Sequence, residues 1–108
     1  MKVIISDEAK NNIKEIFDYI SLDSLRYAKE TTQNIRLYIR KLKESPYIGK
    51  YVLELKNKQY RELIYKNYKI VYSISKSKNE IYILFIVHRA RNFKAFFNSY
   101  IIKNFFNF

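Results

Sequence analysis

The sequence predicts an α+β fold, and three observations support this prediction. At 108 residues the chain has the length of one domain, so we expect a single domain spanning residues 1–108. Apolar residues recur at helical spacing up to about residue 42 and at every second position after Gly49. The runs after Gly49 are separated by short polar turns, which is typical of an antiparallel meander. A helical hairpin packed on an antiparallel sheet satisfies all three observations.

The first elements are a short strand and a helix. Residues 3–5 are apolar and precede Ser6, whose side chain can cap a helix. Asp7 and Glu8 occupy the first turn, where acidic side chains complement the helix dipole. The helix then carries one apolar stripe, made of Ala9, Ile13, Ile16, Phe17 and Ile20.

A second helix follows and forms an antiparallel hairpin with the first. The segment "SLDS" ends the first helix and offers Ser24 as the cap of the next. Pro46 and Gly49 end the second helix, because proline cannot continue the hydrogen-bond ladder and glycine turns the chain. The apolar seam of this helix consists of Leu25, Ala28, Thr32, Ile35, Ile39 and Leu42.

Four strand-like runs follow: "YVLEL", "YRELIY", "YKIVYSIS" and "EIYILFIVHR". The third run alternates apolar and mixed positions, so we expect the helical hairpin to cover its apolar face. The fourth run is apolar at both odd and even positions, which predicts a central strand covered on both faces.

The C-terminal tail, residues 92–108, is rich in aromatic residues and is predicted as a helix or tail. Its aromatic side chains are expected to bury against the sheet or against a partner. The candidates are Phe93, Phe96, Phe97 and Tyr100, and Phe105, Phe106 and Phe108 exceed what one small core should absorb.

The charge is large and uneven. The net charge of +11 arises from residues 26–108, where 18 basic residues face five acidic ones. A field of this sign attracts polyanions such as nucleic acid, the ribosome or an acidic protein, although solubility or a bias toward lysine codons would also produce it. The chain has no cysteine, no apolar run of membrane-spanning length and no signal-peptide pattern, so we expect a cytoplasmic protein without a membrane segment.

Cations on successive strands are the first candidates for a site. We expect the meander to bring Arg61, Lys69 and Arg89 onto one open surface, with Arg91 just beyond the last strand. Guanidinium and ammonium groups gathered in this way suit phosphate, and the alternative is an ordinary solvated face.

Candidate acid–base groups are fewer. His88 is the only histidine, and an imidazole is the kind of acid–base group that RNA cleavage uses; the alternative is a strand-end residue satisfied by local hydrogen bonds. Glu54 and Glu62 are candidate bases, or they pair with a neighbouring lysine or arginine. No pattern indicates a metal site or a cofactor, so we expect neither.

Four segments together carry a family resemblance: "SDEAKNNIKEIFDYI", "SPYIGKYVLEL", "YRELIYKNYKIVYSI" and "IYILFIVHRARNF". Over residues 3–93 their order and spacing resemble the RelE/ParE toxin superfamily, and its ParE branch most. The resemblance implies the growth-arresting component of a type II toxin–antitoxin module. It also implies a cognate acidic antitoxin, whose contact residues we expect in the tail at Phe93, Phe96, Phe97 and Tyr100.

The resemblance leaves the molecular target divided between DNA gyrase, as in the ParE branch, and ribosome-bound mRNA, as in the RelE branch. Arg61, Lys69 and Arg89 match basic sheet residues of RelE-like enzymes. However, Leu63 and Ala95 fall where those enzymes have acid–base groups. A further ribosome-dependent branch has loose counterparts in Glu54, Lys69 and His88. We therefore expect gyrase poisoning, with metal-independent mRNA cleavage as the alternative and a non-toxic RNA-binding module as a further one.

Overall fold

The computed structural model describes residues 1–56 and 58–105, and it confirms the predicted α+β fold. Phe106 and Phe108 lie outside the described residues. Within the described residues, no helix combines the length and apolar character needed to cross a bilayer. The elements, in chain order, are β1 (Lys2–Ile5), α1 (Asp7–Ser21), α2 (Leu25–Lys41), β2 (Lys50–Tyr51), β3 (Tyr60–Tyr65), β4 (Tyr68–Ser75), β5 (Glu80–His88) and α3 (Phe93–Phe105).

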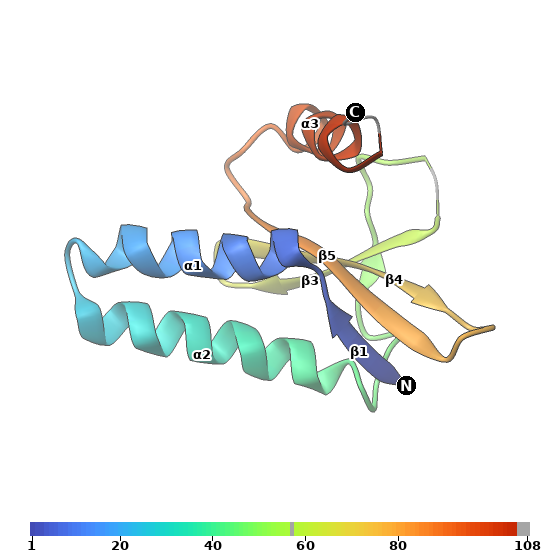
Figure 1. Ribbon diagram of the computed structural model, residues 1–108, viewed down its shortest axis with the longest axis horizontal. Coiled ribbons are helices and arrows are strands. Elements are labelled where there is room, and N and C mark those ends of the chain that lie inside the picture. The colour runs from blue at the N-terminus through green and yellow to red at the C-terminus, as the bar shows by residue number, and fades with distance from the viewer. Residues whose placement is uncertain (57, 106–108) are drawn as a thin grey trace.

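The strands form one five-stranded sheet in the order β1-β5-β4-β3-β2 (Figure 1). Strands β2 to β5 pair antiparallel with their neighbours in sequence, so the predicted meander is confirmed. β1 joins the other edge and pairs with β5 in parallel. The sheet therefore places β5 between β1 and β4.

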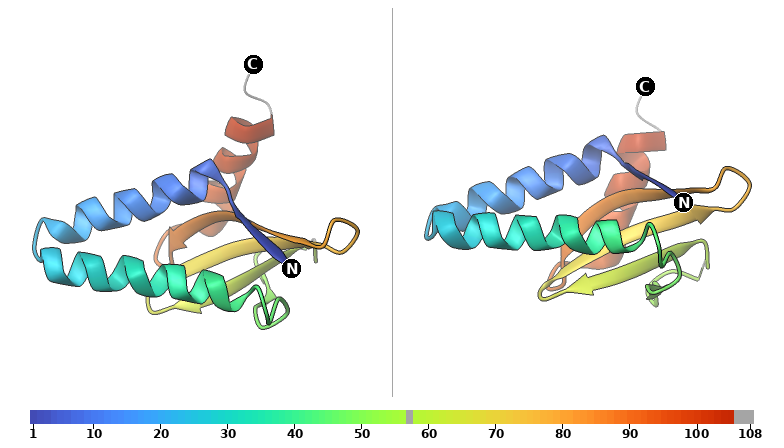
Figure 2. Two further views of the ribbon diagram at one scale, coloured as in Figure 1. Left: turned by 60° about the horizontal axis from the view of Figure 1, so that its bottom comes forward. Right: turned by 90° about the horizontal axis from the view of Figure 1, so that it is seen from below.

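The helical hairpin covers one face of the sheet (Figure 2). Ile35 and Ile39 of α2 pack in one buried cluster with Ile70 and Tyr72 of β4. Both predicted caps are present, and Ser6 also connects α1 to the sheet. Its Oγ accepts a hydrogen bond from Ala9 N at 3.0 Å and donates one to the Leu84 carbonyl at 2.7 Å.

The opposite face is covered by α3, which lies behind the sheet when the hairpin is in front (Figure 2). Its Phe93 and Tyr100 are buried in a second cluster with Phe85 and Val87 of β5. β5 is thus enclosed on both faces, as its unbroken apolar sequence predicted. The described part of the tail packs against the protein's own sheet.

One predicted element is shorter than expected. The run "YVLEL" was predicted as a strand over residues 51–55, but β2 contains only Lys50–Tyr51. Val52 donates a last backbone hydrogen bond to the Tyr60 carbonyl at 3.2 Å and is buried in the second cluster. The chain then turns, with Leu55 N donating to the Val52 carbonyl, and this turn brings Glu54 toward β4.

Candidate functional site

Lys69 lies at the centre of a small ionic cluster on the α3 side of the sheet. Its Nζ is 2.5 Å from Glu54 Oε2 and 3.4 Å from Glu62 Oε2. The side chain of Glu62 is only 3% exposed, and its Oε2 accepts no hydrogen bond among the described residues. Two carboxylates therefore surround one ammonium group, as the pairing interpretation of both glutamates predicted.

The two carboxylates neutralise the positive charge of Lys69, so this cluster is a weak attractant for an anionic ligand. The ring of Phe93 lies over Lys69, with Nζ 5.0 Å from the ring centroid, so α3 also shields it from solvent. Burial by itself raises the pKa of Glu54, but the hydrogen bond and the charge of Lys69 outweigh burial and hold that pKa below its usual value. Glu54 is consequently an ionised partner of Lys69 at neutral pH and a poor proton acceptor.

Arg61 lies on the opposite face, which corrects the expectation of one open cationic surface. In the β3–β4 register Arg61 is opposite Tyr72, whereas Lys69 is opposite Ile64. Facing residues share a side of the sheet and side chains alternate along each strand. Arg61 therefore points to the hairpin side with Tyr72, and Lys69 points to the α3 side.

His88 and Arg89 lie at the end of β5, beside the β3–β4 turn. His88 is exposed, and its Nδ1 accepts a hydrogen bond from Ala90 N at 3.0 Å. Its ring packs edge-on against that of Tyr68, its partner in the β4–β5 register, with the two ring centroids 5.4 Å apart. Tyr68 belongs to the hairpin-side cluster, so His88 also faces the hairpin side and does not join Lys69.

Arg89 and Arg91 are both exposed and are held separately. Arg89 is positioned by the turn, because its backbone N donates to the Asn67 carbonyl at 2.7 Å. Arg91 stacks on Phe96 of α3 with its guanidinium carbon 4.7 Å from the ring centroid. The four predicted cations are thus divided among the two faces and the end of the sheet.

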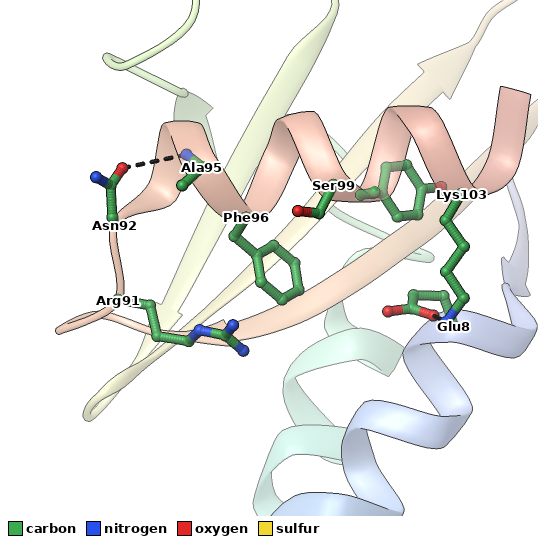
Figure 3. A pocket seen from close by; sticks show the side chains of 8 residues that line it. Glu8, Arg91, Asn92, Ala95, Phe96, Ser99 and Lys103 are labelled. Atoms are coloured by element: carbon green, nitrogen blue, oxygen red, sulfur yellow. Dashed lines mark hydrogen bonds and ion pairs between the residues drawn. The ribbon is translucent and has the colours of Figure 1, made fainter. Parts of the chain in front are cut away.

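A groove of about 390 Å³ runs between α3 and the start of α1 (Figure 3). Arg91 lies near one end, and the other end carries an ion pair between Glu8 and Lys103 at 3.3 Å. Phe96 and Tyr100 contribute apolar surface between them. The groove has room for a peptide side chain. Its Arg91, which has no ion pair among the described residues, has the charge that attracts an acidic partner.

The predicted antitoxin-binding aromatics are arranged around Phe85. Phe93 and Tyr100 are buried, and Phe96 and Phe97 are partly exposed. Their ring centroids lie 4.9–6.3 Å from that of Phe85. All four therefore have a structural role in the second core, and their contact with an antitoxin stays a prediction.

Leu63 and Ala95 have aliphatic side chains, which cannot transfer a proton. Leu63 is partly buried against the hairpin-side core, and Ala95 is exposed in the first turn of α3. Among residues 1–56 and 58–105, no three histidine or carboxylate side chains are grouped closely enough to hold a metal ion.

Sequence reasoning missed the surroundings of Arg61. Its Nη1 donates to the Gly49 carbonyl at 2.7 Å, and its guanidinium carbon is 4.3 Å from the ring centroid of Tyr51 and 5.1 Å from that of Tyr47. Tyr72 donates to the Pro46 carbonyl at 2.8 Å and accepts from Gly49 N at 3.0 Å. The available signal was the pair of tyrosines flanking the only glycine in "PYIGKY".

Comparison with known proteins identifies the family of this chain. The family model described as the ParE toxin of the type II toxin–antitoxin system parDE matches residues 3–93. Among solved structures, the chain is similar to the chromosomal ParDE toxin–antitoxin system from P. aeruginosa, with 20% identity, a TM-score of 0.68, and coverage of 82% of this chain and 95% of that chain.

The chain is also similar to the toxin–antitoxin complex RelBE2 from Mycobacterium tuberculosis, with 14% identity, a TM-score of 0.63, and coverage of 82% of this chain and 96% of that chain. Among curated proteins, none matches this sequence. At these identities the two structures support the fold, whereas the family model covers most of the sequence. The chain therefore belongs to the ParE toxin family of type II toxin–antitoxin systems.

Proposed function

We propose that this ParE-family toxin arrests growth by poisoning DNA gyrase. The observation that carries the proposal is the separation of the groups that metal-free RNA cleavage would need. Such cleavage requires a proton acceptor, a proton donor and free cations around one phosphate. In this chain Lys69 is paired with two carboxylates, and Arg61 and His88 face the other side of the sheet. A protein target needs no such convergence.

The positions of Leu63 and Ala95 support the same proposal. Neither side chain can donate or accept a proton, and each stands where a RelE-like enzyme has an acid–base group. Losing one such group typically lowers a rate by a factor of ~10²–10⁴. An mRNA endonuclease built on this chain would need His88 or Glu54 as a substitute, and Glu54 is already bound to Lys69.

A second candidate function rests on His88 itself. The side chain is exposed, its Nδ1 accepts a backbone hydrogen bond, and Arg89 follows directly. With Nδ1 accepting, a neutral imidazole carries its proton on the other nitrogen, Nε2. This arrangement would suit a ribosome-dependent, metal-independent mRNA endonuclease in which His88 and Arg89 act without Lys69.

The partner in this proposal is an acidic antitoxin that neutralises the toxin in the cytoplasm. The region of net charge +13 would speed the encounter with such a partner. Phe93 and Tyr100 are covered by the sheet, so a partner that leaves α3 in place meets Arg91, Phe96 and Phe97 first. The α3 groove in Figure 3, which is lined by Arg91 and Phe96, is therefore one directly accessible part of the predicted antitoxin surface.

Expression of the chain in bacterial cells tests the proposal. We expect growth arrest, an SOS response and double-strand DNA breaks, because a trapped gyrase leaves cut DNA. His88→Ala should retain all three effects, and co-expression of the acidic product of the adjacent small reading frame should relieve them. A passive RNA-binding module would not arrest growth.

Truncated ribosome-bound mRNA with intact DNA, abolished by His88→Ala, would instead establish the endonuclease candidate. Lys29→Ala, a change at an exposed lysine on the helical hairpin, is the control for nonspecific effects of substitution.

A further inference from the structure

The edge of the sheet at β2 and β3 contains a small basic cavity that the proposed function does not use. It has a volume of about 240 Å³ and is lined in part by Lys58, Arg61 and Lys76 together with Tyr47 and Tyr51. We call these five residues the edge site. It lies on the hairpin side of the sheet, away from the Lys69 cluster.

Arg61 is held in a fixed orientation at this edge site. Its Nη1 is bound to the Gly49 carbonyl at 2.7 Å, and its guanidinium lies against the rings of Tyr51 and Tyr47 at 4.3 and 5.1 Å. A guanidinium group has five N–H donors, so this hydrogen bond leaves several available. An arginine fixed in this way loses less side-chain entropy when it binds a ligand.

Two lysines flank the fixed arginine. Lys58 Nζ lies 5.9 Å from the ring centroid of Tyr51, and Lys76 Nζ lies 6.0 Å from that of Tyr47. Among the described residues, none of these three cations has a carboxylate within 4.0 Å. The adjacent Glu62 points to the other face, where it faces Lys69. The edge site therefore carries three positive charges without an internal counter-charge in the described chain.

The fold holds the walls of the edge site in place. Tyr51 is opposite Arg61 in the β2–β3 register, so the two side chains share a face. The loop that carries Tyr47 is bound to buried Tyr72 through Pro46 and Gly49. Arg61 and its two tyrosines thus stand on strands and on a loop attached to the core.

We propose that the edge site binds the phosphodiester backbone of a nucleic acid. Phosphate oxygens match the donors of an arginine fork, and flanking lysines provide charge for neighbouring phosphates. Exposed tyrosine surface beside these cations supplies contact area for sugars and bases, which an acidic peptide does not require. If the toxin acts on gyrase, as proposed above, these phosphates belong to the DNA that gyrase holds.

A second basic surface on the molecule provides a matched control. The groove between α1 and α2 is lined by four cations, including Lys10 and Lys29, which have no ion pair among the described residues. Its Lys14 is paired with Asp18 at 2.9 Å, and no aromatic ring of this groove is stacked on a cation in the described chain. Removing two lysines there changes the net charge by the same amount as removing two at the edge site.

The experiment measures binding of a fluorescein-labelled 20-base-pair DNA duplex by anisotropy between 50 and 300 mM salt. Each protein is first checked for a native thermal unfolding transition. The wild type should bind. The double variant Lys58→Gln/Lys76→Gln should bind about tenfold or more weakly near 0.1 M salt, and the slope of log K against log salt should shrink by roughly 1.8, the value for two lost phosphate contacts. Lys10→Gln/Lys29→Gln should change affinity by less than about threefold.

Single-stranded DNA and RNA of the same sequence identify which strand type supplies the phosphates. Absence of duplex or single-strand binding by the wild type would overturn the inference, as would equal losses in the two double variants. Displacement of the duplex by polyglutamate at a concentration equal in charge to the DNA would overturn it in favour of an acidic protein ligand. If the wild type does not bind DNA but still poisons gyrase, nucleic-acid binding at the edge site is rejected and the proposed function stands. If it binds DNA through the edge site but does not poison gyrase, the proposed target is rejected and the binding site stands.

Discussion

Replacing Phe85 with alanine should lower the free energy of unfolding by roughly 3–5 kcal/mol, the range for removing a large aromatic side chain from a packed core. Phe85 is fully buried in β5 and is the centre of the second core. Four rings surround it at centroid distances of 4.9–6.3 Å, those of Tyr100, Phe96, Phe93 and Phe97. Its removal leaves a cavity beneath residues 93–100 of α3, so α3 should lose protection before the sheet does.

Urea denaturation followed by circular dichroism measures the loss, and hydrogen exchange on α3 locates it. Phe105→Ala is the control, because Phe105 belongs to the same helix but is 66% exposed. We expect that control to stay within about 0.5 kcal/mol of the wild type. A loss below about 1 kcal/mol for Phe85→Ala would mean that α3 does not pack on β5.

Gly49→Ala should destabilise the protein by about 2–4 kcal/mol, from overpacking and from a weakened hydrogen bond. A Cβ at this position would lie 2.4 Å from Tyr72 Oη, 2.7 Å from Tyr72 Cε1 and 2.8 Å from the Glu62 carbonyl oxygen. Tyr72 cannot move aside easily, because its ring is fully buried and its hydroxyl is bound to Gly49 N and to the Pro46 carbonyl. The loop would have to leave the sheet, and Arg61 would lose its carbonyl partner.

Thermal unfolding measures this effect, and a fall in Tm of about 10 °C or more is expected for a domain of this size. Ile48→Ala is the adjacent control, because Ile48 is 50% exposed and its truncation creates no clash. A Gly49→Ala protein that melts within about 2 °C of the wild type would contradict the position of this loop on Tyr72.

The helices and most strands could be predicted because local signals determine them. Ser6 and Ser24 cap α1 and α2 where the sequence indicates, and the change of apolar period at Gly49 marks the start of the antiparallel meander. The length of β2 was overestimated because "YVLEL" has the apolar spacing of a strand, whereas in the structure the chain turns after Val52, with Leu55 N donating to the Val52 carbonyl.

The division of the cations between two faces was missed although the sequence contains a signal for it. The two-residue turn at Lys66 and Asn67 sets the β3–β4 register, in which Arg61 and Lys69 point to opposite sides. The parallel pairing of β1 with β5 had no such signal, because it joins segments far apart in the chain. The second core had a partial signal: the apolar sequence of β5 predicted a cover on both faces, but only the structure shows that α3 provides the second cover.

The central claim is that this toxin acts on gyrase, and a purified assay tests it most directly. The toxin is incubated with DNA gyrase, ATP and supercoiled plasmid, and then with detergent and protease; in parallel, it is incubated with ribosomes translating a defined mRNA. We predict linear plasmid that accumulates with toxin and requires gyrase, while the mRNA stays intact. Plasmid that remains uncut beside mRNA cleaved on the ribosome, with cleavage lost in His88→Ala, would contradict the claim.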